Sequence, residues 1–189
     1  MSEQQLDELS HALSDVRSGL PTLRAWGTHL ADLLTAGGRL LACGNGGSAA
    51  EAQHLTGELV GRYVRDRRPL SAIALNADTS ALTAIGNDYG AEEMFARQVR
   101  AHGRPGDVLV LLSCSGSSAN VVAAAKTAHE LGVTTWALTG PTPNPLAALC
   151  DDAVTVDSGL TSTVQEIHLV LVHLLCTAVD DALGVGTHR

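Results

Sequence analysis

Two predicted helices of the chain carry carboxylate, amide and imidazole side chains that could do chemistry together. His54 and Glu58 stand four residues apart, so they lie on one face of their helix. A second, largely apolar helical pattern carries Gln165, His168 and His173. A carboxylate and an imidazole at one site can take and return protons, and both are also ligands for zinc. The spacing leaves both chemistries open, and for His168 we expect a core or interface position, as is usual for a histidine on an apolar helix.

Two turns rich in serine and glycine each follow a short apolar run and precede a helical pattern. They read Gly44-Asn-Gly-Gly-Ser48 and Ser113-Cys-Ser-Gly-Ser-Ser118. Glycines let the backbone approach a ligand, free amides at a helix N-terminus attract anions, and hydroxyls add donors. Such turns also serve as simple helix caps, but two of them favour a phosphate site. The residues expected at it are Gly46, Gly47, Ser48, Ser113, Ser115 and Ser118.

Neither turn has the features of a nucleotide site. Both lack the Gly-Lys-Ser/Thr ending of a Walker loop. The first turn continues as Gly44-Asn-Gly-Gly-Ser-Ala49 and lacks the third glycine of a dinucleotide fingerprint. We therefore expect no nucleotide cofactor.

Two further polar stretches lie between these turns. The step Asn87-Asp88 predicts a turn whose side chains could also bind a sugar hydroxyl. An arginine cluster is expected to be a solvated loop, with a contribution to substrate capture as the alternative. Its members are Arg62, Arg65, Arg67 and Arg68.

Short apolar runs alternate with helical patterns through most of the chain. The expected strands cover 40–43, 72–75, 108–112, 134–138 and 153–156, and the expected helices cover 48–62, 79–100 in two pieces, 118–131 and 161–183. Continuous apolar strands are buried on both faces, which predicts an α/β fold with a three-layer, doubly wound, parallel five-stranded sheet. In the flavodoxin-like order 2-1-3-4-5, the strands before the two turns are neighbours at the switch point, where ligands bind.

The first part of the chain predicts a helical pair ahead of the sheet. Leucines recur at three- and four-residue steps, and Pro21 separates the two helices. We expect a single domain over 1–189, in which residues 1–36 serve packing and assembly and residues 37–185 form the α/β core.

The composition of the chain indicates which classes of partner and which cellular compartment to expect. The 189 residues carry a net charge of −8, which argues against nucleic acid or an anionic membrane as the main partner. Four widely spaced cysteines are expected to be reduced thiols. The N-terminus is acidic and polar, unlike a signal peptide, and no apolar run approaches the ~20 residues of a membrane span. These features predict a cytoplasmic protein without a membrane partner.

Several blocks of the sequence resemble one family in order and spacing. Five blocks are similar to those of the phosphoheptose isomerases, which belong to the sugar isomerase (SIS) domains. They are Cys43-Gly-Asn-Gly-Gly-Ser-Ala-Ala-Glu-Ala-Gln-His54, Glu58-Leu-Val-Gly-Arg-Tyr63, Ile85-Gly-Asn-Asp-Tyr-Gly90, Ser113–Ser118 and Gln165-Glu-Ile-His-Leu-Val-Leu-Val-His173. The resemblance covers nearly the whole chain. It implies conversion of sedoheptulose 7-phosphate to D-glycero-D-manno-heptose 7-phosphate by a homotetramer with active sites at its subunit interfaces.

The resemblance also implies roles for individual residues. Glu58 and His173 become the acid–base pair, the serines of the two turns bind phosphate, and Asn45, Asp88 and Gln165 contact the sugar, with Asn87 beside them. It further implies zinc, with the ligands His54, Glu58, Gln165 and His173. The ~12 Å rise between Gln165 and His173 along one helix is long for two ligands of one ion.

Three positions depart from the family pattern. Cys114 stands where threonine is usual, Ser117 where asparagine is usual, and Thr163 where arginine is common. The last change bears on the sugar end of the substrate, so an isomerase of another sugar phosphate stays an alternative. A further alternative is a non-catalytic SIS protein that binds sugar phosphate or a replication initiator. Because such relatives lack the final histidine, His173 favours an enzyme.

Overall fold

The computed structural model of the chain describes residues 2–185. The N-terminal region forms α1 (Ser2–Asp15), the 3-10 turn η1 (Val16–Gly19) and α2 (Leu20–Thr35). The strands are β1 (Leu40–Gly44), β2 (Ala72–Ala74), β3 (Val108–Ser113), β4 (Thr134–Thr139) and β5 (Asp152–Thr155). The later helices are α3 (Gly47–Val60), α4 (Thr79–Tyr89), α5 (Glu93–His102), α6 (Ala119–Glu130), α7 (Pro145–Leu149) and α8 (Thr161–Ala182).

All five strands pair in parallel, in the order β2-β1-β3-β4-β5. This confirms the predicted sheet and its flavodoxin-like order. Gly44 at the end of β1 pairs with Leu112 of β3, so the two serine-rich turns leave adjacent strands at one edge of the sheet. The topology therefore brings the two turns together, as the switch-point rule predicts.

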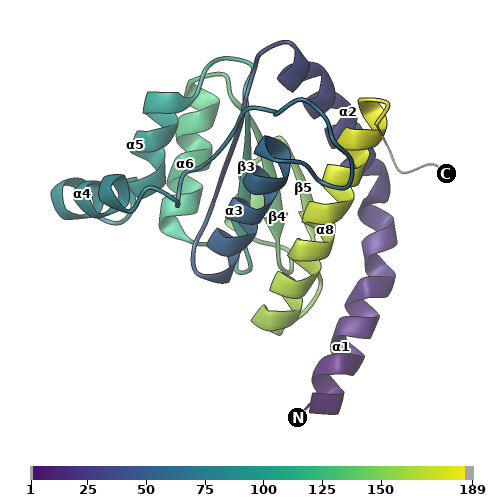
Figure 1. The fold of residues 1–189 in the computed structure, drawn as a ribbon. Helices are drawn as coiled ribbons and strands as arrows, with labels where there is room; N and C mark the ends of the chain where they lie inside the picture. The colour runs from purple at the N-terminus through teal and green to yellow at the C-terminus, as the bar shows by residue number, and fades with distance from the viewer. Residues whose placement is uncertain (1, 186–189) are drawn as a thin grey trace.

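Helices cover both faces of the sheet (Figure 1). The core on one face combines side chains of α2, α3 and α8, and the core on the other face combines those of α5, α6 and α7. Consecutive residues of β1 alternate between them, with Leu40 and Ala42 in the first core and Leu41 and Cys43 in the second. The three-layer prediction is thus confirmed. Pro21 lies in the first turn of α2, as expected for the start of the second N-terminal helix.

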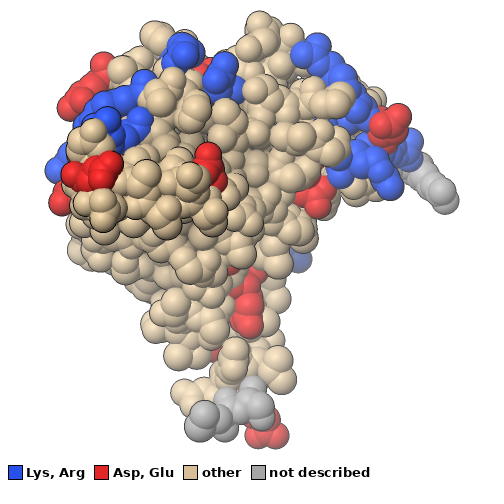
Figure 2. Space-filling view, turned by 60° about the vertical axis from the view of Figure 1, so that its left-hand side comes forward, with Lys and Arg blue, Asp and Glu red and all other residues tan. Residues whose placement is uncertain are grey.

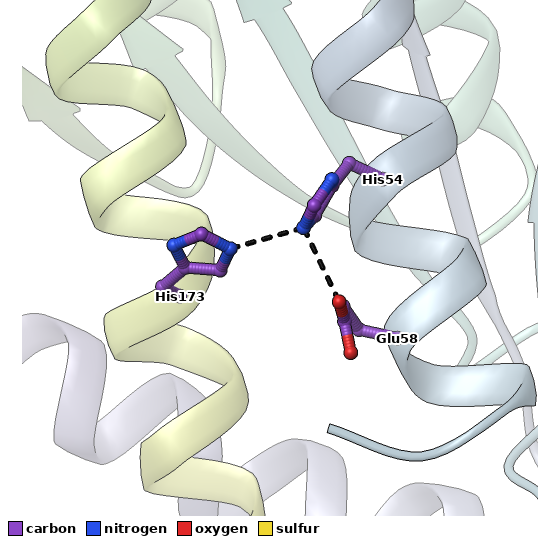
Figure 3. Close-up of side chains that lie close together, drawn as sticks. All are labelled: His54, Glu58 and His173. Carbon is purple, nitrogen blue, oxygen red and sulfur yellow. Dashed lines mark hydrogen bonds and ion pairs between the residues drawn. The ribbon is translucent and has the colours of Figure 1, made fainter. Parts of the chain in front are cut away.

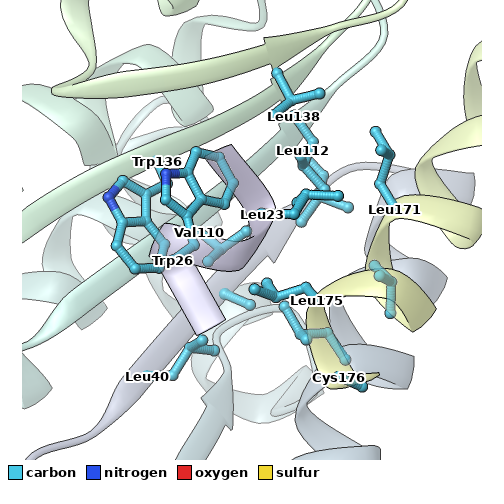
Figure 4. Packing of buried hydrophobic residues seen from close by; sticks show 14 of the residues in the cluster. Leu23, Trp26, Leu40, Val110, Leu112, Trp136, Leu138, Leu171, Leu175 and Cys176 are labelled. Carbon is cyan, nitrogen blue, oxygen red and sulfur yellow. The ribbon is translucent and has the colours of Figure 1, made fainter. Parts of the chain in front are cut away.

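Both tryptophans lie in the core under α2. The rings of Trp26 and Trp136 stack with their centroids 4.6 Å apart, beside Leu23 and Val110 (Figure 4). The indole N–H of Trp26 donates to Asp152 at 2.8 Å. This stack anchors α2 on β4, and aliphatic side chains from α8, including Leu171 and Leu175, fill the rest of that layer (Figure 4).

One expectation about apolar segments was wrong. By length and composition, α8 is long and apolar enough to cross a membrane. Half of its most apolar 18-residue window is buried inside the protein. Because it packs against α2 and α3, α8 has the composition of a core helix.

Candidate active site

Three predicted site residues converge in the gap between α3 and α8 (Figure 3). His54 and Glu58 point from one side of α3, and the His54 Nε2 atom lies 3.3 Å from Oε1 of Glu58. His173 of α8 faces them, with its Nε2 atom 3.0 Å from Nε2 of His54. Tyr63 stacks on the ring of His173, with ring centroids 5.8 Å apart. The structure thus brings the predicted acid–base residues to one point.

The geometry of this trio allows proton exchange. Across the 3.0 Å contact one imidazole nitrogen must donate and the other accept, and a protonated His54 forms an ion pair with the Glu58 carboxylate. His54 is 40% exposed and Glu58 is 23% exposed at the side chain, so the trio opens to the surface while keeping a fixed arrangement. A substrate can therefore reach a carboxylate and an imidazole together, as general acid–base catalysis requires.

The same atoms fit a metal ion. One ligand atom each from His54, Glu58 and His173 lies within 4.8 Å of the others. Two imidazole nitrogens and one carboxylate oxygen form a common three-residue zinc set that leaves one position open. The amide of the fourth predicted ligand, Gln165, lies against Gly47, about 10 Å along α3 from His54. As a ligand, Gln165 stays a prediction.

The first serine-rich turn leads directly into α3. Gly46 adopts a φ of +55°, which a side chain would disfavour, and α3 starts at the next residue. Ser48 is buried in the first turn of the helix, with its Oγ 3.8 Å from Sγ of Cys114 in the second turn. The free backbone amides of the α3 N-terminus and the Ser48 hydroxyl therefore lie beside the second turn.

The second turn carries a cluster of hydroxyls. Ser113 and Ser118 lie 3.2 Å apart at Oγ, and Ser115 Oγ accepts from the backbone N–H of Ser117. Gly116 has a φ of +60° and allows the chain to reverse here. Together with Ser48 these groups provide several donors and no cation, a composition suited to one phosphate at the start of two helices.

An asparagine pair joins the two turns. Asn45 and Asn120 exchange amide hydrogen bonds of 2.9 and 3.0 Å. Asn45 was singled out from the sequence, but Asn120 was missed. Its position in the first turn of α6, two residues after Ser118, could have identified it as a site residue.

Comparisons with known proteins bear on this arrangement. Residues 5–140 match the SIS domain family. The chain is 62% identical over 182 residues to the phosphoheptose isomerase of Streptomyces coelicolor, covering 96% of this chain and 79% of that protein. The chain belongs to the phosphoheptose isomerase family of SIS domains. The phosphoheptose isomerase structure from Neisseria gonorrhoeae superposes with a TM-score of 0.87 at 42% identity, covering 95% of this chain and 97% of that one. The Francisella tularensis structure gives 0.89 at 35% identity, covering 95% and 96%.

Asn87 and Asp88 lie on α4, away from the other predicted site residues. The predicted turn was wrong: both residues are exposed in the last turn of α4, which ends at Gly90, and their side chains bond to each other at 2.8 Å. The helix α4 packs against α5 and projects at the side of the domain away from α8 (Figure 1). Within a single chain they are not beside His173.

The arginine cluster divides into two kinds of residue. Arg62, Arg65 and Arg68 are exposed, as expected for a solvated loop. Arg67 contradicts that expectation, because its side chain is only 3% exposed and pairs with Asp180 of α8. The sequence gives no local sign of this pair, since the two residues are 113 positions apart.

The predicted core histidine has an unusual environment. His168 is fully buried, with Nδ1 3.7 Å from Oε2 of Glu51. Within residues 2–185, neither ring nitrogen has a hydrogen-bond partner. His168 therefore lies in the core, as expected, beside a carboxylate and beyond direct bonding distance.

Two of the four cysteines, Cys43 and Cys176, are buried in the core as expected, and Cys114 and Cys150 are partly exposed. All four are free. Burial, with the carboxylate of Glu58 nearby, raises the pKa of Cys176 to about 12. Burial also raises the pKa of Cys114, although the Ser48 hydroxyl bond opposes the shift. At neutral pH both thiols therefore stay protonated, and Cys114 contributes to the turn as a small neutral side chain.

Proposed function

We propose that this phosphoheptose isomerase family member converts sedoheptulose 7-phosphate to D-glycero-D-manno-heptose 7-phosphate. The observation that carries the proposal is the meeting of Glu58 and His173, from two different helices, at one surface-open point. Ser48 precedes His54 by about 9 Å along α3. A sugar phosphate held at the serine-rich turns can therefore extend along the helix towards the acid–base pair.

The reaction needs two proton movements. Glu58 takes one proton from C1 of the ketose, forming an enediol, and returns it to C2. His173 takes the proton of the O1 hydroxyl and delivers it to O2. The product has an aldehyde at C1 and a hydroxyl at C2, and both side chains end in their starting protonation states.

The serines and amides of the two turns hold the phosphate. Ser48, Ser113, Ser115 and Ser118 donate hydroxyl bonds to its oxygens, together with the amides at Gly46 and Gly47. Asn45 contacts the sugar and is kept in place by Asn120. Gln165, packed against Gly47, lies at the same end of α3 and contacts the sugar chain.

We also propose that zinc binds at His54, Glu58 and His173, with Gln165 as the fourth candidate ligand. The donor set supports this, because its nitrogen and oxygen atoms are those that zinc prefers. Zinc bound there supplies a Lewis acid that polarises the carbonyl and stabilises negative charge on the enediolate.

Assembly into a homotetramer, with active sites at subunit interfaces, is part of the same proposal. The helix α1 projects beyond the domain (Figure 1) and carries the exposed Leu6 and Leu13, and α8 exposes Leu169. On the face in Figure 2, Lys and Arg side chains gather in the upper part, while the lower part, with the projecting N-terminal helix, shows a few acidic side chains among uncharged ones. A neighbouring subunit would cover these leucines and could bring Asn87 and Asp88 to another chain's site.

The free cysteines support a reducing compartment, and we propose the cytoplasm. The net charge of −8 argues against nucleic acid or a membrane surface as a partner.

The test is incubation with sedoheptulose 7-phosphate, with and without a chelator, followed by identification of the product. We expect the aldoheptose phosphate without chelator and a reduced rate after chelation. No aldoheptose phosphate under either condition would overturn the proposal. Thr163, which stands where the family commonly has arginine, makes an isomerase of another sugar phosphate the second candidate. Turnover of a different ketose phosphate alone would establish that alternative, whereas thermal stabilisation by sugar phosphates without turnover would indicate a binding protein.

A further inference from the structure

A buried guanidinium connects the two helices that carry the acid–base pair. Arg67 donates from Nε to Oδ1 of Asp180 on α8 at 2.8 Å. It also donates from Nη2 to the backbone carbonyl of Glu58 at 2.7 Å, and from Nη1 to that of Leu59 at 2.9 Å. The Arg67 and Asp180 side chains are 3% and 4% exposed. One planar group thus binds three acceptors on α3 and α8, and a fourth, the carbonyl of Arg68, at 3.3 Å.

The acceptors on α3 belong to the turn that carries Glu58. The last four carbonyls of a helix have no helical partner, and helix ends fray when these groups are left to water. The carbonyl of Gly57 is satisfied by the N–H of Gly61 at 2.8 Å. Arg67 donates to the next two, of which the carbonyl of Leu59 also accepts from the N–H of Leu70 at 3.0 Å. The positive charge of Arg67 suits the negative end of the helix dipole. Arg67 therefore fixes the helix turn from which the Glu58 side chain projects.

The acceptor on α8 is in line with His173. Asp180 follows His173 by seven residues, so both lie on the same side of α8, about 10 Å apart along its axis. A shift of α8 relative to the end of α3 would break the bond between Arg67 and Asp180. The same shift would change the distance between Glu58 and His173.

A buried ion pair is a weak source of stability, because desolvation offsets most of its attraction, and apolar residues of similar size often serve as well. Its distinctive property here is geometric, since a guanidinium presents several donors in a rigid plane. We propose that Arg67 and Asp180 are positioning residues that hold Glu58 at its working distance from His173. This inference rests on the proposed function, in which these two groups exchange protons with the substrate.

The test compares three variants. Arg67→Lys keeps the positive charge for Asp180 but cannot also reach both carbonyls in one plane. Arg67→Met/Asp180→Leu removes both buried charges and keeps an apolar contact. Arg39→Met is the control: it removes another ion pair, 3.6 Å from Nε of Arg39 to Asp107, at the opposite, amino end of the sheet.

We expect kcat to fall 10- to 100-fold in Arg67→Lys and in the double variant, since a displacement of about 1 Å can have that effect. KM should change less than threefold, because the phosphate turns lie at the other end of α3. Arg39→Met should retain the wild-type kcat. The ¹⁵N NMR signals of the His54 and His173 rings should shift in Arg67→Lys and in the double variant, and not in the control.

Wild-type kcat in folded Arg67→Lys would overturn the inference, and so would failure of that variant to fold, which would make the role purely structural. If the double variant does not fold, Arg67→Lys decides alone. A wild-type protein without isomerase activity would refute the proposed function instead. The ring signals still test the positioning role of Arg67 and Asp180 in that case, and unchanged signals in Arg67→Lys would refute it.

Discussion

Replacing Gly47 by alanine should impair the active site without weakening the fold. A Cβ atom at this position would lie 2.5 Å from Oε1 of Gln165. Carbon and oxygen atoms pack at about 3.5 Å, so the Gln165 amide must retreat by roughly 1 Å. Gly47 is the first residue of α3 and has no positive φ, so its backbone accepts alanine. Alanine should leave stability unchanged or raise it by up to about 1 kcal/mol, while the displaced amide lowers kcat/KM by about 10- to 100-fold.

A second glycine of the same helix provides the matched control. A Cβ at Gly57 would meet no atom within 4 Å, so Gly57→Ala gains the same helix propensity and displaces nothing. Both variants should unfold at or up to about 4 °C above the wild-type temperature. Steady-state turnover of sedoheptulose 7-phosphate should fall only in Gly47→Ala. Equal kcat/KM in the two variants would show that the placement of Gln165 against Gly47 has no part in the reaction.

Two further perturbations follow from the phosphate turns and the buried thiols. Ser115→Ala removes an exposed hydroxyl from the second turn, so KM for the sugar phosphate should rise about tenfold, equivalent to ~1.4 kcal/mol, with kcat and the unfolding temperature unchanged; an unchanged KM would exclude Ser115 from phosphate binding. Burial raises the pKa of Cys176 from 9.0 to about 12, so between these values the unfolded thiol ionises while the folded one does not, and stability falls as pH rises. The free energy of unfolding in urea should therefore fall with pH in both proteins above pH 9. In Cys176→Ala it should fall less steeply than in the wild type, by up to ~1.4 kcal/mol per pH unit. The same steepness in both proteins would contradict the burial argument.

Local patterns were sufficient to predict the contact between His54 and Glu58, because one helix turn fixes it. The meeting of the two serine-rich turns was also predictable, since adjacent parallel strands end at the same edge of a sheet. The contact of His54 with His173 joins residues 119 positions apart and depends on how α8 lies against α3. No rule of sequence spacing predicts how two helices pack, although the residue types alone marked both histidines as candidate site residues.

The errors have equally specific causes. The Asn87-Asp88 step resembled a turn because both residues favour turns, but the helix continues to Gly90, whose φ of +89° marks its end. Arg67 was grouped with its exposed neighbours because sequence proximity suggested one solvated loop. Its acceptors are helix-end carbonyls and a distant aspartate, which only the folded chain brings together. The membrane-span length of α8 was missed because scattered polar residues break its sequence into short apolar runs.

The central claim is that Glu58 and His173 move protons between C1 and C2 of a heptose phosphate. Its most direct test is the rate of conversion of sedoheptulose 7-phosphate by Glu58→Gln, a variant of nearly the same shape, beside the wild type. The account predicts aldoheptose phosphate from the wild type, and a kcat about 10²- to 10⁴-fold lower in a folded Glu58→Gln protein that still binds the sugar phosphate. A kcat near the wild-type value in that variant would contradict the claim.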